Sequence, residues 1–458
     1  MSNAEKAATA VKKAGARKAL NAANLTRLGP ERLAALLMEI SESGPAIKRR
    51  IKLELAAEAG AGVLAAEIAR RIDAIDDSRA RINWRKYKEF VRDLDAHRQA
   101  VAGPLALLDA NLALDLIVRL VGLSASLASR IKDTKGELEE VFSEAVTDAA
   151  EIAPRAALVD ASSLADRLFE IVRYAPPGLS LPLLRATAPA LHGQPLVDLR
   201  NRLETVSKGR GAPRAWRVGA QILADAQGDV DGFIALFTTS EAVLPPVGAE
   251  IARRLLGAGR MEEARKALER SEPDRASAGD PGAMDWTQVQ IEVMEALGDA
   301  EGAQAARWTS FERDLNPNAL RAYLRRLDGF DDVEAEDKAM DLALEHRDVH
   351  GALALLVDWP RLDLAARLVA ERGDQLAGDK SELLERAARA LEGRYPLAAT
   401  LLLRALIWDV ARHADTERYT QAKRWMLEAA SLAAALPEDG GYEDHEAFAE
   451  RVARLRRW

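Results

Sequence analysis

The chain has 458 residues and a formal net charge of −8, with 48% hydrophobic but only 5% aromatic residues. This length exceeds what one hydrophobic core fills, and the apolar fraction is too high for a disordered chain. The absence of cysteine excludes disulfides, thiolate catalysis, cysteine zinc sites and iron–sulfur clusters, and it fits a reducing compartment, so we expect a cytoplasmic protein.

The N-terminal part of the chain is basic. Residues 1–100 contain 20 Lys and Arg against 13 Asp and Glu, so this part carries +7 and the remainder −15. Such a region can attract nucleic acid or another acidic partner, although an ordinary solvated helix surface gives the same count. Residues 1–20 are Ala-rich and lack an apolar signal region, so we interpret them as a disordered basic tail; a surface-binding amphipathic helix is the alternative. The cations of this tail are Lys6, Lys12, Lys13, Arg17 and Lys18.

Residues 21–206 are predicted to form a helical region. Pro30 precedes an apolar stripe with helical spacing, and Gly44-Pro45 then ends one helix and begins the next. The same kind of pattern predicts further helices near 46–59, 63–74, 82–102, 104–121 and 136–151. The most apolar segment, Leu112–Ala128, is interrupted by Asp115 and Arg119, so no membrane span is predicted. No segment shows sustained apolar/polar alternation, so we predict no strands.

Residues 207–214 are predicted to be a linker, because Ser207 to Arg214 combines two Gly, a Pro and three cations. A second loop rich in helix breakers spans residues 271–282. From residue 215 to 458 the pattern indicates repeated helical hairpins of the tetratricopeptide kind. Gly257 and Gly259 end one helix, for example, and Glu262 begins the next.

Further hairpin signals recur in this C-terminal region. Leu297-Gly298-Asp299, Trp359-Pro360 and Tyr395-Pro396 each precede an alanine-rich helix start, and the two aromatic–proline pairs lie 36 residues apart. A single helical hairpin cannot bury its apolar face, so we expect the hairpins to stack into an α-solenoid with a concave face. The predicted fold class is therefore all-α.

Several segments of the chain resemble a family of uncharacterised bacterial proteins, a domain of unknown function, and are closest to its alphaproteobacterial members. The resemblance covers residues 20–430 and departs from the family pattern at Tyr419 to Met426. It implies a helical fold and no stated activity. The segments that carry it are Lys48-Arg49-Arg50-Ile51-Lys52-Leu53-Glu54-Leu55, Ala224-Asp225-Ala226-Gln227-Gly228-Asp229-Val230-Asp231, Arg307-Trp308-Thr309-Ser310-Phe311-Glu312, Phe330-Asp331-Asp332-Val333-Glu334-Ala335-Glu336, Asp358-Trp359-Pro360 and Pro396-Leu397-Ala398-Ala399-Thr400.

Two groups of residues partly match the patterns of metal sites. His346 and His350 have the spacing that places two imidazoles on one face of a helix for zinc, but the glutamate base of a metalloprotease is missing, which favours two surface histidines. An acidic run extends from Asp328 to Asp341, including Asp331. It matches no calcium loop, and we interpret it as a helix N-terminus with Asp331 or Asp332 as the cap. No metal or cofactor is therefore predicted.

Three other patterns were considered for binding. Gly209-Arg210-Gly211 lacks the Lys-Ser/Thr of a phosphate loop and is predicted to be flexible. Cations and rings alternate from Trp84 to Arg92, a pattern that can serve nucleic acid, although Trp84, Tyr87 and Val91 are expected to face the core. We interpret a set of five tryptophans as packing residues between hairpins, with a ligand groove as the alternative: Trp286, Trp308, Trp359, Trp408 and Trp425.

These observations favour a non-catalytic scaffold that binds another protein or a peptide through a helical-repeat surface. No catalytic residue is predicted. Two alternatives stay open: a nucleic-acid-associated protein that binds through the basic N-terminal helices, and an enzyme whose active-site residues are dispersed along the chain. The sequence does not indicate a membrane partner or an oligomeric state.

Overall fold

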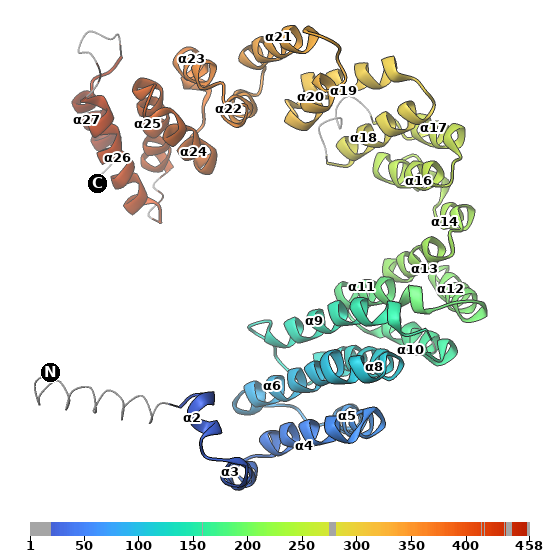
Figure 1. The fold of residues 1–458 in the computed structure, drawn as a ribbon. Helices are drawn as coiled ribbons and strands as arrows, with labels where there is room; N and C mark the ends of the chain where they lie inside the picture. Colours follow the sequence, from blue (N-terminus) through green and yellow to red (C-terminus); the bar gives the residue numbers. More distant parts are fainter. Residues whose placement is uncertain are drawn as a thin grey trace, which may run out of the picture. The chain divides into compact units, whose positions relative to one another are not determined.

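A computed structural model describes residues 20–157, 159–273, 281–413, 415, 417–434, 436 and 442–455. Every regular element in these residues is a helix and none is a strand, which confirms the all-α prediction. Successive helices pack against each other in adjacent pairs (Figure 1). The predicted basic tail, residues 1–20, lies outside the described residues except for Leu20.

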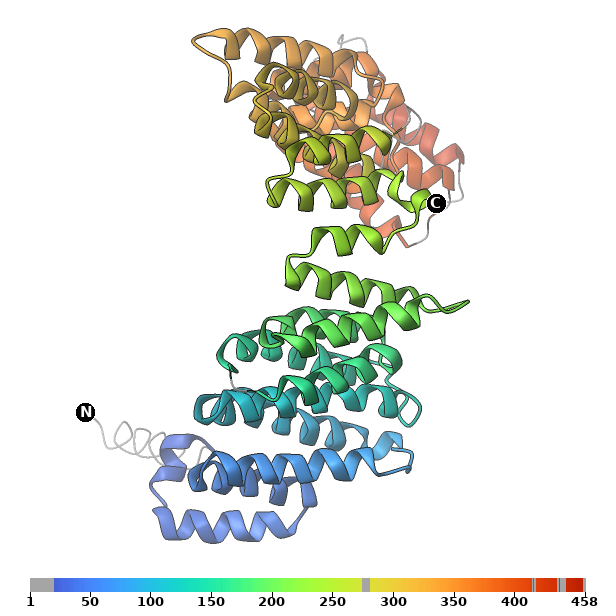
Figure 2. The same cartoon turned by 90° about the vertical axis from the view of Figure 1, so that its right-hand side faces the viewer.

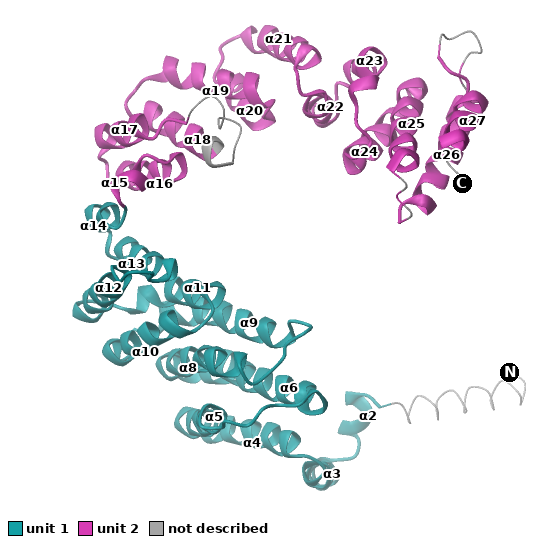
Figure 3. Cartoon of the chain, turned by 180° about the vertical axis from the view of Figure 1, so that it is seen from behind, with its two compact units in different colours: residues 1–237 teal, residues 238–458 magenta. Residues whose placement is uncertain are grey.

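The chain divides into two compact units, residues 1–237 (unit 1) and 238–458 (unit 2), shown in different colours in Figure 3. This division differs from the linker predicted at 207–214. In the structure residues 208–213 join α12 (Gln194–Ser207) to α13 (Arg214–Gln227), and the two helices pack together inside unit 1. The Gly, Pro and cations of this segment therefore form a hairpin turn.

Unit 1 is built of helices stacked one above another (Figure 2). Most of these helices begin at a residue that favours a helix start. Pro30 and Pro45 lie in the first turns of their helices. Asn83 and Asp160 cap theirs with side-chain oxygens. Before α12 the helices are α2 (Ala22–Thr26), α3 (Pro30–Glu42), α4 (Pro45–Ala59), α5 (Ala61–Asp76), α6 (Trp84–Ala100), α7 (Ala106–Leu108), α8 (Ala110–Ala128), α9 (Glu137–Ile152), α10 (Ala161–Tyr174) and α11 (Pro177–Thr187); α14 (Val230–Ala235) follows α13.

The core of unit 1 centres on α8, ten of whose residues are buried. By length and composition α8 is the one described helix that could cross a membrane, with a mean hydropathy of 1.5, and 56% of its apolar window is buried inside the protein. It packs against α5, α9 and α10. Its start corrects the helix predicted at 104–121: Pro104 lies in a π-helical turn that follows α6, and Asp109 caps the new helix by accepting from the backbone N–H of Asn111 at 2.9 Å.

A buried carboxylate ties α4, α5 and α6 together. The Asp93 side chain is 2% exposed and accepts from Arg49 Nε at 2.7 Å and from Arg71 Nη2 at 2.6 Å. His97 lies one turn further along α6, and burial lowers its pKa. A buried charge is tolerated only when it is paired in this way, so this cluster fixes how the three helices meet.

Unit 2 continues the pattern of paired helices. Its main core extends from Phe311 to Val452. The helices are α15 (Thr239–Ala242), α16 (Pro245–Gly257), α17 (Met261–Arg270), α18 (Pro281–Ala296), α19 (Ala300–Asp314), α20 (Pro317–Leu324), α21 (Asp331–Glu345), α22 (Val349–Asp358), α23 (Leu362–Arg372), α24 (Ser381–Leu391), α25 (Pro396–His413), α26 (Tyr419–Ala433) and α27 (His445–Leu455).

Candidate functional site

In the described part of unit 2, six helices begin in the same way. In each, a fully buried alanine donates its backbone N–H to the carbonyl of the residue four positions earlier, which directly precedes the helix. A methyl side chain at this step lets the preceding helix approach closely, as in stacked hairpins. The alanines are Ala264, Ala303, Ala352, Ala365, Ala399 and Ala422.

A second recurring device is the sequence Asp-x-x-Gly at a helix start. Asp299 accepts from the backbone N–H of Gly302 at 2.8 Å, and Asp348 accepts from Gly351 at 3.0 Å. A Cβ at either glycine would collide with the capping carboxylate. Asp229 caps α14 in unit 1 through Gly232 in the same manner. Repeated caps and repeated alanines therefore give the chain a common local design for its hairpins.

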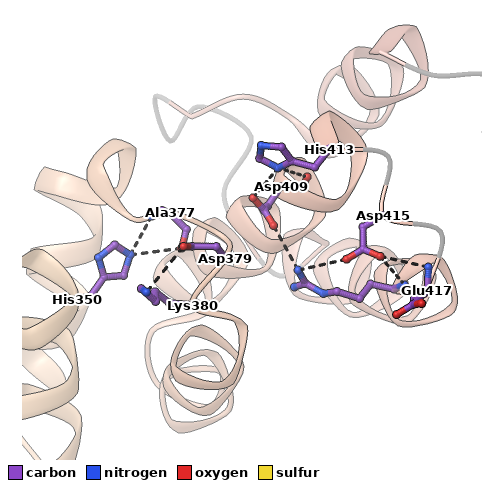
Figure 4. A network of polar contacts seen from close by, with 9 residues as sticks. His350, Ala377, Asp379, Lys380, Asp409, His413, Asp415 and Glu417 are labelled. Atoms are coloured by element: carbon purple, nitrogen blue, oxygen red, sulfur yellow. Dashed lines mark hydrogen bonds and ion pairs between the residues drawn. The ribbon is translucent and has the colours of Figure 1, made fainter. Parts of the chain in front are cut away.

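The hairpins leave a groove of about 670 Å³ between α22 and the start of α24. Its lining combines an apolar floor, which includes Ala354 and Leu383, with the charged side chains of Lys380 and Arg386. His350 stands at its edge, where Nε2 accepts from the backbone N–H of Ala377 at 2.9 Å (Figure 4). Lys380 Nζ lies 3.8 Å from Asp379 and Arg386 lies 3.0 Å from Asp358.

A second groove, of about 690 Å³, lies beside α21. Its lining comes from α19, α21 and the segment after α21, and it includes Arg313, Lys338, Leu342 and Arg347. Lys338 also lies over the ring of Trp308, with its Nζ 4.8 Å from the ring centroid. Both grooves open to solvent, and their linings mix apolar carbon with charges of both signs.

The structure separates the two histidines considered for zinc. His346 ends α21, and its Nδ1 accepts from the backbone N–H of Asp348 at 3.1 Å, whereas His350 lies in the first turn of α22. The expectation that both share one helix face is wrong, because Asp348 between them caps a new helix. Among the described residues no group of three His, Cys, Asp or Glu is arranged to hold a metal ion.

The acidic run at 328–341 does begin a helix, as predicted. Asp331, Asp332 and Glu334 lie in the first turn of α21, where carboxylates complement the helix dipole. The predicted capping role of Asp331 or Asp332 is wrong, since the cap residue is Phe330 and it makes no side-chain capping bond. The predicted flexible segment Gly209-Arg210-Gly211 lies in the turn between α12 and α13.

The polar contacts near α25 are structural ties. The Asp409 carboxylate lies 3.0 Å from His413 Nδ1 and accepts from Arg418 Nη1 at 3.3 Å (Figure 4). Arg418 also lies 3.9 Å from Asp415. They join the end of α25 to the residue before α26.

The five tryptophans pack between helices as predicted. Three of them donate their indole N–H to a neighbouring element: Trp286 to Ser271 Oγ at 3.0 Å, Trp359 to Glu336 at 3.0 Å and Trp425 to Glu385 at 2.8 Å. The ring of Trp308 lies 5.1 Å from that of Tyr323, and Arg451 lies over the ring of Trp408.

The run from Trp84 to Arg92 behaves differently from its prediction. Val91 is buried and Tyr87 is half-buried, but the Trp84 side chain is 80% exposed, so the expectation that it faces the core is wrong. Trp84 instead borders a pocket of about 420 Å³ at the start of α6, here called the basic–aromatic pocket. Its lining is Ile82, Trp84, Arg85, Tyr87, Lys88, Ile131, Lys132, Thr134 and Lys135.

The sequence did not predict that the segment between α8 and α9 contributes to this pocket. Lys132 and Lys135 come from the segment between α8 and α9, more than forty residues after Trp84, and only the fold brings them beside it. The cation-rich turn Arg130-Ile131-Lys132-Asp133-Thr134-Lys135 was the available signal.

The chain matches no curated protein. The family of unknown function DUF6880 matches residues 15–215 and residues 207–457, which together are nearly the whole chain. The two matched segments meet at residues 207–215, within the turn between α12 and α13 and at the start of α13. The chain therefore belongs to the DUF6880 family of unknown function.

Proposed function

We propose that this protein is a non-catalytic interaction scaffold of the cytoplasm, in which tetratricopeptide-like hairpins stack as an α-solenoid and bind another protein or a peptide. The observation that supports the proposal is the shared helix start of unit 2, a buried alanine at the same step of α17, α19, α22, α23, α25 and α26. Repeated units of this kind offer a series of similar grooves in place of one catalytic cavity.

The groove between α22 and α24 is the proposed binding surface. Leu383 and Ala354 supply apolar contact, while Lys380 and Arg386 supply charge at the rim. Such a mixture gives affinity through the apolar floor and selects orientation through the charges. We therefore propose a partner segment with apolar side chains and at least one carboxylate.

The test is affinity capture from cytosol with the full-length chain, after nuclease treatment and at near-physiological salt. Lys380→Glu reverses a charge in the groove. Arg389→Glu is the matched control, since its side chain lies on α24, the helix that Lys380 directly precedes, is 74% exposed and does not line the groove. The proposal expects a partner that the wild type and Arg389→Glu retain and Lys380→Glu loses. Equal capture by all three, or capture of nothing, would contradict it.

A further inference from the structure

The basic–aromatic pocket has a built frame. Asn83 accepts from the backbone N–H of Arg85 at 2.9 Å and of Lys86 at 3.3 Å, which fixes the backbone at Trp84, the first residue of α6. The opposite wall is held by the backbone N–H of Ile82, which donates to the Arg130 carbonyl at 3.1 Å. The exposed ring and the facing segment are therefore positioned before any ligand arrives.

The carboxylate of Asp133 lies close to the pocket, and both of its oxygens accept internal hydrogen bonds. Asp133 Oδ1 accepts from the Tyr87 hydroxyl at 2.5 Å, and Oδ2 accepts from the backbone N–H groups of Leu138 and Glu139, each at 3.0 Å. Asp133 thus orders the turn that carries Lys132 and Lys135.

Four cations line the pocket, and among the described residues none of them forms an ion pair: Arg85, Lys88, Lys132 and Lys135. No carboxylate stands in the lining. The guanidinium of Arg85 lies 5.3 Å from the centroid of the Trp84 ring, so cation and ring form one continuous surface. An exposed tryptophan among unpaired cations is unusual for a solvated helix face, where large aromatic rings are normally covered.

We propose that the basic–aromatic pocket binds single-stranded nucleic acid, with an unpaired base on the ring of Trp84 and backbone phosphates on Lys88, Lys132 and Lys135. A nucleotide offers a planar face and a negative charge together, which is the combination that the pocket complements. An acidic peptide would satisfy the cations but leave the ring without a stacking partner, and duplex bases are not available for stacking. The site lies in unit 1 and is independent of the groove proposed in unit 2.

The test measures fluorescence anisotropy of labelled twelve-nucleotide oligo-U and oligo-dT with the full-length chain, over a range of salt concentrations. Trp84→Ala should weaken binding roughly tenfold or more, since a stacked base contributes that much in single-strand complexes. Lys132→Ala/Lys135→Ala should also reduce the slope of log K against log salt by about 1.4, about 0.7 for each lost phosphate contact. Because all three side chains lie at the surface, the melting temperature should be unchanged.

Lys266→Ala/Lys423→Ala, which removes two cations from unit 2, is the matched control and should bind like the wild type. A labelled poly-glutamate peptide tests the other explanation, that the cations of the pocket bind an acidic peptide. The proposal is overturned if no oligonucleotide binds at low salt, if Trp84→Ala binds like the wild type, or if poly-glutamate binds as tightly as the oligonucleotide. The outcome does not bear on the groove of unit 2, because capture there is measured after nuclease treatment.

Discussion

The Tyr87 hydroxyl donates to Asp133 Oδ1 at 2.5 Å and thereby joins α6 to the turn that begins α9. Burial and the neighbouring Asp133 raise the pKa of Tyr87, so the phenol is protonated and donates at neutral pH. Burial opposes ionisation of Asp133, but the hydrogen bonds from Tyr87 and the backbone outweigh it and lower the pKa of the carboxyl.

This pair predicts a pH dependence of stability. Because the folded pKa of Asp133 is lower than its unfolded value of 3.8, its contribution is complete above that value and is lost as the pH falls through the folded pKa. Tyr87→Phe should lower the free energy of unfolding by about 1 kcal/mol at pH 7, since a partly buried hydrogen bond of this kind contributes about that much. Urea unfolding at pH 7 and pH 2.5 checks this: the loss should shrink at the lower pH, and an unchanged loss would contradict it.

The Asp-x-x-Gly cap of α19 predicts coupling between Asp299 and Gly302. Asp299→Ala should cost about 1 kcal/mol, because an N-cap bond is lost. Gly302→Ala should also destabilise, because the new Cβ displaces the capping carboxylate. In the Asp299→Ala background the same change should stabilise by up to ~1 kcal/mol, since alanine is then simply the better helix former. Hydrogen exchange of α19 in the four variants measures this, and additive effects would exclude the coupling.

The buried alanine of each hairpin predicts an asymmetry along α23. Ala365 is fully buried against the neighbouring helices, whereas Ala370 on the same helix is exposed. Ala365→Leu should lower the stability of unit 2 by about 1–3 kcal/mol through overpacking, while Ala370→Leu should change it little. Thermal unfolding of the two variants compares them directly. An equal loss of stability in both would show that the buried alanine does not mark a close approach of two helices.

The sequence predicted most helices because the residues that begin and end a helix act locally. Pro30, Gly44 and Asp299 each act within one turn of the chain. It failed where the answer depends on distant contacts. A segment rich in Gly, Pro and cations marks a hairpin turn as well as a linker, and only packing of α13 on α12 distinguishes the two. Periodicity predicted that Trp84 faces the core, but at the first residue of α6 the described residues leave it 80% exposed. Lys132 and Lys135 reach the same pocket only through the fold.

The boundary between the two compact units predicts how the chain can be divided. α13 packs on Leu203, and a Cβ at its Gly219 would lie 3.1 Å from Leu203 Cδ1. A fragment of residues 1–206 removes α13 and uncovers Leu199 and Leu203, both fully buried in the structure, while a fragment of residues 1–237 keeps them covered. The longer fragment should therefore melt cooperatively and at a higher temperature. Circular dichroism of both fragments provides the measurement, and equal melting would favour a boundary at 207–214.

The last prediction concerns Arg404, which is 6% exposed in α25. One nitrogen, Nη1, donates to the Glu443 carbonyl at 2.6 Å, but Nε and Nη2 have no partner among the described residues. Burial lowers the pKa of the guanidinium. A buried charge without a carboxylate is costly, and an apolar side chain of similar shape is often tolerated better. Arg404→Met should therefore raise the free energy of unfolding by about 1 kcal/mol. It keeps the contact with Phe448, over whose ring the guanidinium lies at 4.9 Å.

Arg404→Ala separates charge from shape at the same position. It removes the charge as well but leaves a cavity beside Phe448, so it should lower stability by about 2 kcal/mol or more. Urea unfolding of the three proteins, with and without added sulfate, is the measurement. If Arg404→Met is instead less stable than the wild type, and sulfate stabilises the wild type alone, then the guanidinium is held by an anion and the charge is a binding feature of α25.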